Sequence, residues 1–140
     1  MKKALWVLLL SLPLVAQQSL AAPVDPTLIH AVTEGYWQAG PADGAYRVLV
    51  FSGGFEHVSS RVVAEWVARA TDAEAAPTVT AGYELVPFGS YSLGAPQVTR
   101  LKNGVRVTLS GVSTIVPDIT ITCVFELHPK GQVTVVRKCG

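Results

Sequence analysis

Residues 45–67 read AYRVLVFSGGFEHVSSRVVAEWV, and this stretch decides which fold class the chain can adopt. Its first part, Ala45–Phe51, alternates as a β-strand does and carries apolar residues on both faces, so we expect both faces to be covered. Gly53 and Gly54 then interrupt the apolar run, because paired glycines permit backbone angles that other residues resist. The stretch therefore predicts a strand, a bend at the two glycines, and a second element beyond them.

The second element, within Val58–Ala76, fits two structures. As a helix near residues 59–75 it would place several valines and Trp66 on one stripe, with charged residues opposite at four-residue spacing. As a strand it would alternate through Trp66 and reach a hairpin loop at Asp72–Pro77. We favour the strand, because the segments downstream are strand-like and consecutive strands usually pair.

Turn signals divide the rest of the chain into further short strands. Asn103-Gly104 lies between two alternating runs, which predicts a two-residue type I′ hairpin within Val98–Ser110. The segment Pro87–Pro96 is rich in Gly, Ser and Pro and is expected to be a loop. The other expected strands are Glu34–Gln38, Thr78–Val86, Ile119–Leu127 and Val133–Lys138.

About eight strands joined by short turns predict an all-β fold, either an antiparallel sandwich or a small barrel. The alternative is an α+β fold in which one helix near residues 59–75 covers an antiparallel sheet.

The first residues predict export. Lys2 and Lys3 precede the apolar run Ala4–Ala16, and Ser19-Leu20-Ala21 has the small-x-small pattern of a signal-peptidase site. We expect residues 1–21 to be a cleaved signal peptide and residues 22–140 to be one exported domain, periplasmic or secreted; a retained membrane anchor is the alternative. No second long apolar run follows, so we expect no membrane span after signal removal.

Charge and size narrow the function classes. The whole chain has a formal charge of +1, and removing the two lysines of the signal lowers it to −1. A near-neutral domain lacks the basic surface of a nucleic-acid binder, so we expect no nucleic-acid partner. About 120 residues are enough for a single two-layer core.

The two cysteines, Cys123 and Cys139, predict a disulfide, because an even pair in an oxidising compartment usually forms one. We expect a type I turn at His128–Gly131, with Gly131 left-handed, which would set the register of the last two strands. The expected pairs are His128 with Gln132, Leu127 with Val133, Phe125 with Val135, and Cys123 with Arg137. Cys139 would lie one diagonal step from Cys123, roughly 7 Å away, a gap that strand twist and a loose chain end could close.

The candidate site residues lie at two places. Phe55, Glu56 and His57 follow the glycine bend, and Phe88 and Tyr91 lie in the Pro87–Pro96 loop, where exposed aromatics favour contact with a partner.

The sequence lacks the motifs of the common catalytic and cofactor sites. No two histidines have ligand spacing, and there is neither a serine nucleophile elbow nor a P-loop, so we expect no metal and no cofactor. The leading hypothesis is a non-catalytic binding module for a protein or an envelope glycan, in an inhibitor-like or adhesion-like role. The alternatives are a small hydrolase centred on Glu56 and His57, and a structural subunit that pairs through a sheet edge.

Overall fold

The computed structural model describes residues 26–54 and 57–140, and within these ranges every regular element is a β-strand. The nine strands are β1 (Thr27–Ala39), β2 (Ala42–Gly53), β3 (Ser59–Ala68), β4 (Thr78–Val86), β5 (Tyr91–Leu93), β6 (Gln97–Leu101), β7 (Gly104–Ser113), β8 (Thr120–His128) and β9 (Gln132–Arg137).

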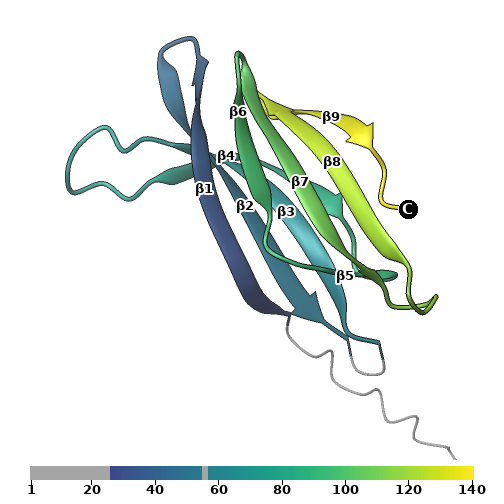
Figure 1. Cartoon of the computed structure of the whole chain (residues 1–140). Helices are drawn as coiled ribbons and strands as arrows, with labels where there is room; N and C mark the ends of the chain where they lie inside the picture. The colour runs from purple at the N-terminus through teal and green to yellow at the C-terminus, as the bar shows by residue number, and fades with distance from the viewer. Residues whose placement is uncertain (1–25, 55–56) are drawn as a thin grey trace, which may run out of the picture.

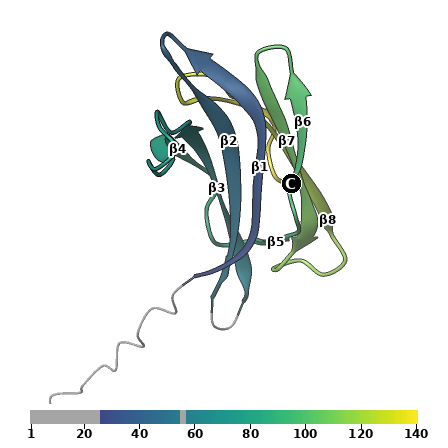
Figure 2. The same ribbon diagram turned by 90° about the vertical axis from the view of Figure 1, so that its left-hand side faces the viewer.

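The strands form two separate antiparallel sheets. The first has the order β1-β2-β3-β4, and the second has the order β5-β7-β8-β9 with β6 also paired to β7. Figures 1 and 2 show the sheets as two layers, between which the chain passes from β4 to β5. The prediction of an all-β antiparallel sandwich is therefore confirmed, and the small closed barrel is not formed.

The α+β alternative is wrong, because the segment after the glycine bend is the central strand β3. It pairs with β2 on one side and with β4 on the other. Val62, Ala64 and Trp66 are buried while the residues between them are partly exposed, which is the two-residue period of a strand. Val58, which a helical stripe would bury, is 55% exposed. The expected loop at Asp72–Pro77 connects β3 to β4.

Two adjacent serines on β3 hold the segment that connects β4 in the first sheet to β5 in the second. Ser59 Oγ accepts a hydrogen bond of 3.0 Å from the backbone N–H of Gly89, and Ser60 Oγ accepts one of 2.8 Å from that of Leu93. Both serines are buried, and these bonds satisfy polar groups that water does not reach. They hold β5, a short strand inside the segment Pro87–Pro96 that was expected to be a loop throughout.

The core lies between the inner faces of the two sheets. Trp66 and Tyr46 pack edge to face with ring centroids 6.0 Å apart, and Trp66 Nε1 donates a 2.7 Å hydrogen bond to the carbonyl of His128 in the opposite sheet. The Tyr46 hydroxyl is buried and has no hydrogen-bond partner within the described part of the chain. Burial raises the pKa of Tyr46 to about 12.

Three local expectations need correction. The β6–β7 hairpin forms, but Leu101 pairs with Gly104 and Asn103 does not have a positive φ, so the turn residues are Lys102 and Asn103 and the turn is not type I′. In the β8–β9 turn, Gly131 has the expected positive φ of 72°, but Lys130 also has a positive φ, 65°, which a type I turn does not contain. The expected strand Glu34–Gln38 is only part of β1.

The disulfide between Cys123 and Cys139 is present, with its Cα atoms 4.5 Å apart. The expected pairs of Leu127 with Val133 and of Phe125 with Val135 are confirmed. The expected pair of Cys123 with Arg137 is wrong: Arg137 pairs with Val124, because Val136 is an extra residue in β9. The bulge shifts the end of the chain by one position relative to β8, and the Cα atoms lie closer than the expected diagonal step.

Within the ranges that the structure describes, no helix is long and apolar enough to cross a membrane.

Candidate binding site

The two long sides of the sandwich differ, and the side where β1 meets β6 and β7 is sealed. Arg100 on β6 donates two hydrogen bonds, of 2.7 and 2.9 Å, to Glu34 Oε1 on β1, and this interaction is the main cause of the lowered pKa of Glu34. Gly35, with a φ of 75°, lies so close to β7 that a Cβ there would overlap the side chain of Val105. Contact at this side is therefore close enough to require a glycine.

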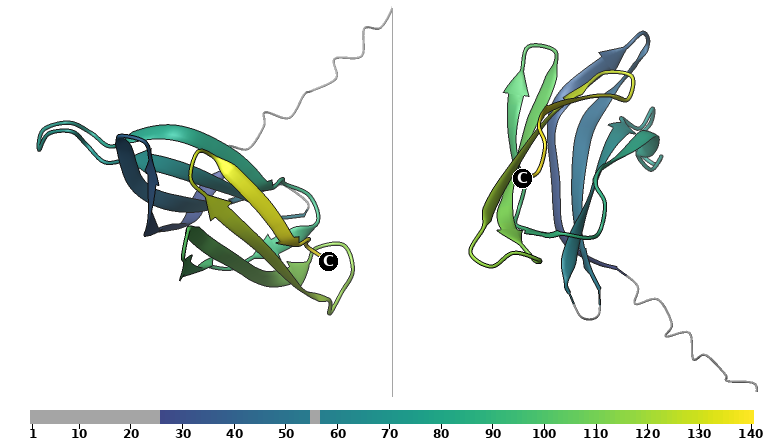
Figure 3. Two further views of the ribbon diagram at one scale, coloured as in Figure 1. Left: turned by 90° about the horizontal axis from the view of Figure 1, so that it is seen from above. Right: turned by 90° about the vertical axis from the view of Figure 1, so that its right-hand side faces the viewer.

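The opposite side, which we call the open side, is bordered by the edge strands β4 and β9 (Figure 3, right). Register places Tyr83 opposite inward-facing Ala64, and Val135 opposite inward-facing Phe125. Both should be core residues, yet Tyr83 and Val135 are each 47% exposed. No other described strand pairs with the outer edge of β4 or of β9. The open side therefore presents part of the inner surface of the sandwich to solvent.

The lower pocket is an apolar hollow of about 220 Å³ on the open side, where both edge strands end. The disulfide fastens the chain end that forms one of its walls, and the hydroxyl of Tyr91 donates a 3.2 Å hydrogen bond to the carbonyl of Cys139 there. The pocket is lined by Leu85, Val86, Pro87, Tyr91, Phe125, Val135, Lys138 and Cys139.

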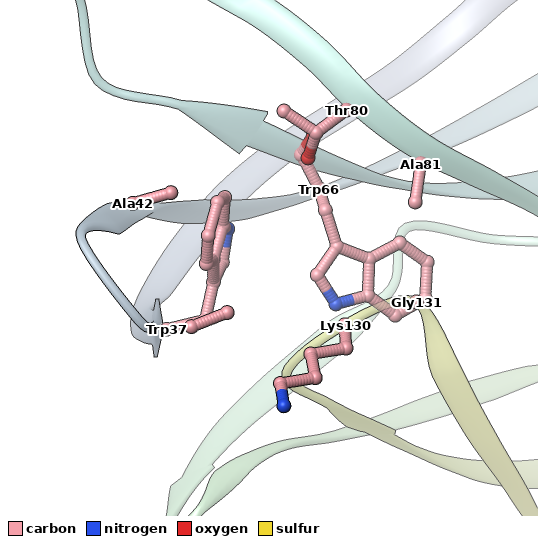
Figure 4. Close-up of a pocket in the computed structure, with 8 residues that line it drawn as sticks. Trp37, Ala42, Trp66, Thr80, Ala81, Lys130 and Gly131 are labelled. Carbon is pink, nitrogen blue, oxygen red and sulfur yellow. The ribbon is translucent and has the colours of Figure 1, made fainter.

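The upper pocket, of about 250 Å³, lies at the other end of the open side. Figure 4 shows the indole rings of Trp37 and Trp66 on two sides of this space, with the side chain of Lys130 extending past Trp66. Trp37 Nε1 donates a 2.9 Å hydrogen bond to the carbonyl of Ala45, which fixes its ring. Gly131 lies close to Ala81 here, so the edges of the two sheets approach each other at this end.

Basic side chains without a carboxylate partner gather along β9. Among the described residues no carboxylate lies within 4.0 Å of Lys130, Arg137 or Lys138. The other arginines of the described ranges are each paired. Those pairs are Arg47–Glu65, Arg61–Glu84, Arg69–Asp43, Arg100–Glu34 and Arg106–Glu126. The open side is thus apolar at its floor and positively charged along one rim.

Of the three candidates at the glycine bend only His57 is described, and it lines neither pocket of the open side. Phe55 and Glu56 fall outside the described residues, so the proposed pairing of Glu56 with His57 stays a prediction. His57 is exposed. Gly54 has a φ of 117°, and a Cβ there would overlap the carbonyl of His57, so the bend does depend on glycine.

Phe88 and Tyr91 lie in different surroundings. Phe88 is 39% exposed, and its ring packs over Gly53. Tyr91 is partly buried against the core and lines the lower pocket. Of the selected residues that the structure describes, Tyr91 is therefore the one at the open side. Contact of Phe88 with a partner stays a prediction.

Residues 26–54 and 57–140 contain no group of three or more His, Cys, Asp or Glu side chains placed to hold a metal ion. Comparison of the chain with protein-family models, with curated proteins and with solved structures found no match.

Alternation within the expected strands Thr78–Val86 and Val133–Lys138 does not reveal that Tyr83 and Val135 lie at the open side. Their alternation is that of any inward-facing strand residue, and only the position of β4 and β9 at the sheet edges leaves them uncovered. The charges offered a weak signal, since Lys130, Arg137 and Lys138 surround the last strand without an acidic residue among them.

Proposed function

We propose that this chain is an exported, non-catalytic binding domain, and that it binds a partner protein at the open side of the sandwich. The observation that carries the proposal is the exposure of inward-facing side chains: Val135, which lines an apolar pocket, and Tyr83, on the other edge strand, are both half-exposed, while the opposite side is sealed. Exposed apolar surface of this kind is typical of protein interaction sites. A free strand edge next to it adds backbone donors and acceptors that a partner can pair with.

A protein suits the open side better than a glycan does. The two indole rings there, those of Trp37 and Trp66, are 4% and 1% exposed, so neither presents a free face to a sugar, and Tyr83 is the half-exposed ring that remains. The accessible surface is instead valine, leucine, proline and tyrosine, together with strand edges. Both features match an apolar polypeptide segment.

A photo-cross-linking residue at position 135 tests this proposal. Thr134 is the matched control, because it lies next to Val135 on the same exposed strand and faces the other way. We expect position 135 to capture a partner protein in the native compartment and position 134 to capture much less of it. The purified partner should then bind the parent protein and bind a Val135→Lys variant at least about tenfold more weakly. Equal capture at both positions, or full binding by Val135→Lys, would contradict the proposal.

Export forms part of the proposed function. The intramolecular disulfide is compatible with an oxidising compartment, and the Lys2–Ala21 pattern supports cleavage after Ala21. Mass spectrometry of the protein recovered outside the cytoplasm should find Ala22 at the N-terminus. Exported soluble protein that still begins at Met1 would contradict this reading.

The hydrolase alternative is separated by changing Glu56 and His57 to alanine together. The proposed function expects the purified partner to bind this double variant as it binds the parent, because His57 lies outside both pockets of the open side.

A further inference from the structure

The outer edge of β9 is the most available backbone on the open side. Gln132–Val135 pairs regularly with β8 before the bulge at Val136. Within the described ranges no hydrogen bond from elsewhere in the chain reaches Gln132–Lys138, apart from those of the β8–β9 pairing. β4 is a poorer edge, because Thr80 and Leu85 are extra residues relative to β3 and each one interrupts its register. Bulges of this kind protect an edge from pairing.

The two edge strands run in the same direction along the open side. Ala81 and Gly131 line the upper pocket, and Val86 and Lys138 line the lower one, so both strands pass from the upper pocket toward the lower. At the rise of an extended chain, the seven steps from Gly131 to Lys138 cover about 23 Å. A single added strand of about seven residues would span both pockets, and it could run antiparallel to β4 and β9 alike.

The apolar floor and the basic rim of the open side determine which residue types the added strand should carry. The floor of the lower pocket is apolar, so side chains directed inward from an added strand must be apolar. The rim carries Lys130, Arg137 and Lys138, which have no carboxylate neighbour within the described residues. An acidic side chain on the added strand would complement them, whereas a basic one would be repelled.

From this arrangement we infer that β9 takes an extended segment of the partner as an added strand, and that this segment alternates apolar residues with at least one acidic residue. The inference rests on the proposed function and adds the conformation and the chemistry of the bound segment. Apolar side chains of the segment fill the lower pocket beside Val135, and its backbone pairs with Gln132–Val135. Its carboxylate lies at the Arg137–Lys138 end.

The probe is a random library of 12-residue peptides displayed on phage and selected against the purified, disulfide-bonded protein. Selected peptides should alternate apolar residues with Asp or Glu. Their binding should weaken as salt rises, because screening reduces the attraction between exposed charges. Hydrogen exchange should show new protection at Gln132–Val135. Methylating the peptide backbone nitrogens that pair with β9 should abolish binding, and methylating the nitrogens between them should not.

Charge-reversal variants test the acidic preference. The double variant Arg137→Glu with Lys138→Glu should bind the selected peptides at least about tenfold more weakly. Selection against that variant should favour basic peptides instead. Lys102→Glu is the matched control, since Lys102 is also exposed and has no described carboxylate within 4.0 Å but lies at the β6–β7 turn. Its affinity should stay within about twofold of the parent, and unfolding curves establish that all variants are folded.

Several results would overturn the inference. If the selected peptides lack acidic residues, or if they bind the charge-reversed variant as tightly as the parent, the inferred acidic residue of the segment is wrong. If the peptide still binds after methylation of either set of its backbone nitrogens, it does not bind as an added strand. If the protein associates with itself through β9 as its concentration rises, a second copy of this chain occupies the edge. If position 135 still cross-links a partner, each of these outcomes leaves the proposed function standing. No partner at position 135 together with no selected peptide would overturn both.

Discussion

Breaking the Cys123–Cys139 disulfide should destabilise the fold by an amount that the loop length sets. The bond closes a loop with a sequence separation of 16. In the chain-entropy estimate, a cross-link of that length removes about 3 kcal/mol of freedom from the unfolded state. Natural domains are stable by roughly 5 to 15 kcal/mol, so this one bond accounts for a large share of the total. In a domain of this size we expect a decrease in Tm of about 10 °C or more.

The assay compares urea unfolding of the oxidised and the reduced protein. Reduction leaves both sulfur atoms in place, so the difference in unfolding free energy reports the cross-link without the cavity that a Cys123→Ala change would add. The loss of protection from hydrogen exchange should concentrate in β9 and the chain end, because the bond ties Cys139 to β8. The reduced protein should also bind the selected peptides more weakly, since Cys139 forms part of the lower pocket.

Two results would refute this reasoning. A free energy of unfolding that changes by less than about 1 kcal/mol on reduction would show that the loop is already constrained in the unfolded chain. Two free thiols in unfolded, unreduced protein taken from its native compartment would show that the bond does not form there.

Three further predictions concern single side chains. Tyr46→Phe removes a buried hydroxyl without a described partner and should stabilise the fold by about 1 kcal/mol near neutral pH. Because burial raises the pKa of Tyr46 to about 12, the parent should lose stability as pH rises from about 10, where unfolded tyrosine ionises, toward about 12; an advantage of the variant that does not widen over this range would contradict the assignment. Gly54→Ala should cost more than about 1 kcal/mol in urea unfolding, because its φ is 117° and a Cβ would meet the His57 carbonyl, whereas Gly53→Ala needs only a small movement of the Phe88 ring; equal stability of the two variants would count against a bend that depends on Gly54. Tyr91→Ser should lower the unfolding free energy by about 2 kcal/mol and Phe88→Ser by about 1 kcal/mol or less, because only Tyr91 packs against the core and bonds to the chain end; a larger loss for Phe88→Ser would reverse the assignment of the two rings.

Local patterns were sufficient to predict most strands. Ala45–Phe51, Thr78–Val86 and Ile119–Leu127 all lie within or overlap observed strands, because short apolar or alternating runs between turn signals are typical of strands. In Ala45–Phe51 only the face of Tyr46, Val48 and Val50 is fully buried, so the expectation that both faces are covered was wrong. The segment after Gly54 was ambiguous, since its valines and Trp66 satisfy both a helical and a strand period. Pairing of β3 on both of its edges resolves the ambiguity in favour of the strand, and this pairing involves residues distant in the sequence.

The sequence by itself determined the disulfide partners and the positive φ at Gly131, because each depends on residues close together in the chain or on a pair with no competitor. It favoured the all-β class, which the pairing of β3 then decided. Only the tertiary structure decided that β4 and β9 border one open side, that Val136 bulges, and that Tyr83 and Val135 stay exposed although they face inward. The physical reason is that alternation tells which face of a strand is apolar, whereas exposure depends on whether another strand lies beside it. That neighbour comes from a distant part of the chain, and no described strand supplies it at the outer edges of β4 and β9.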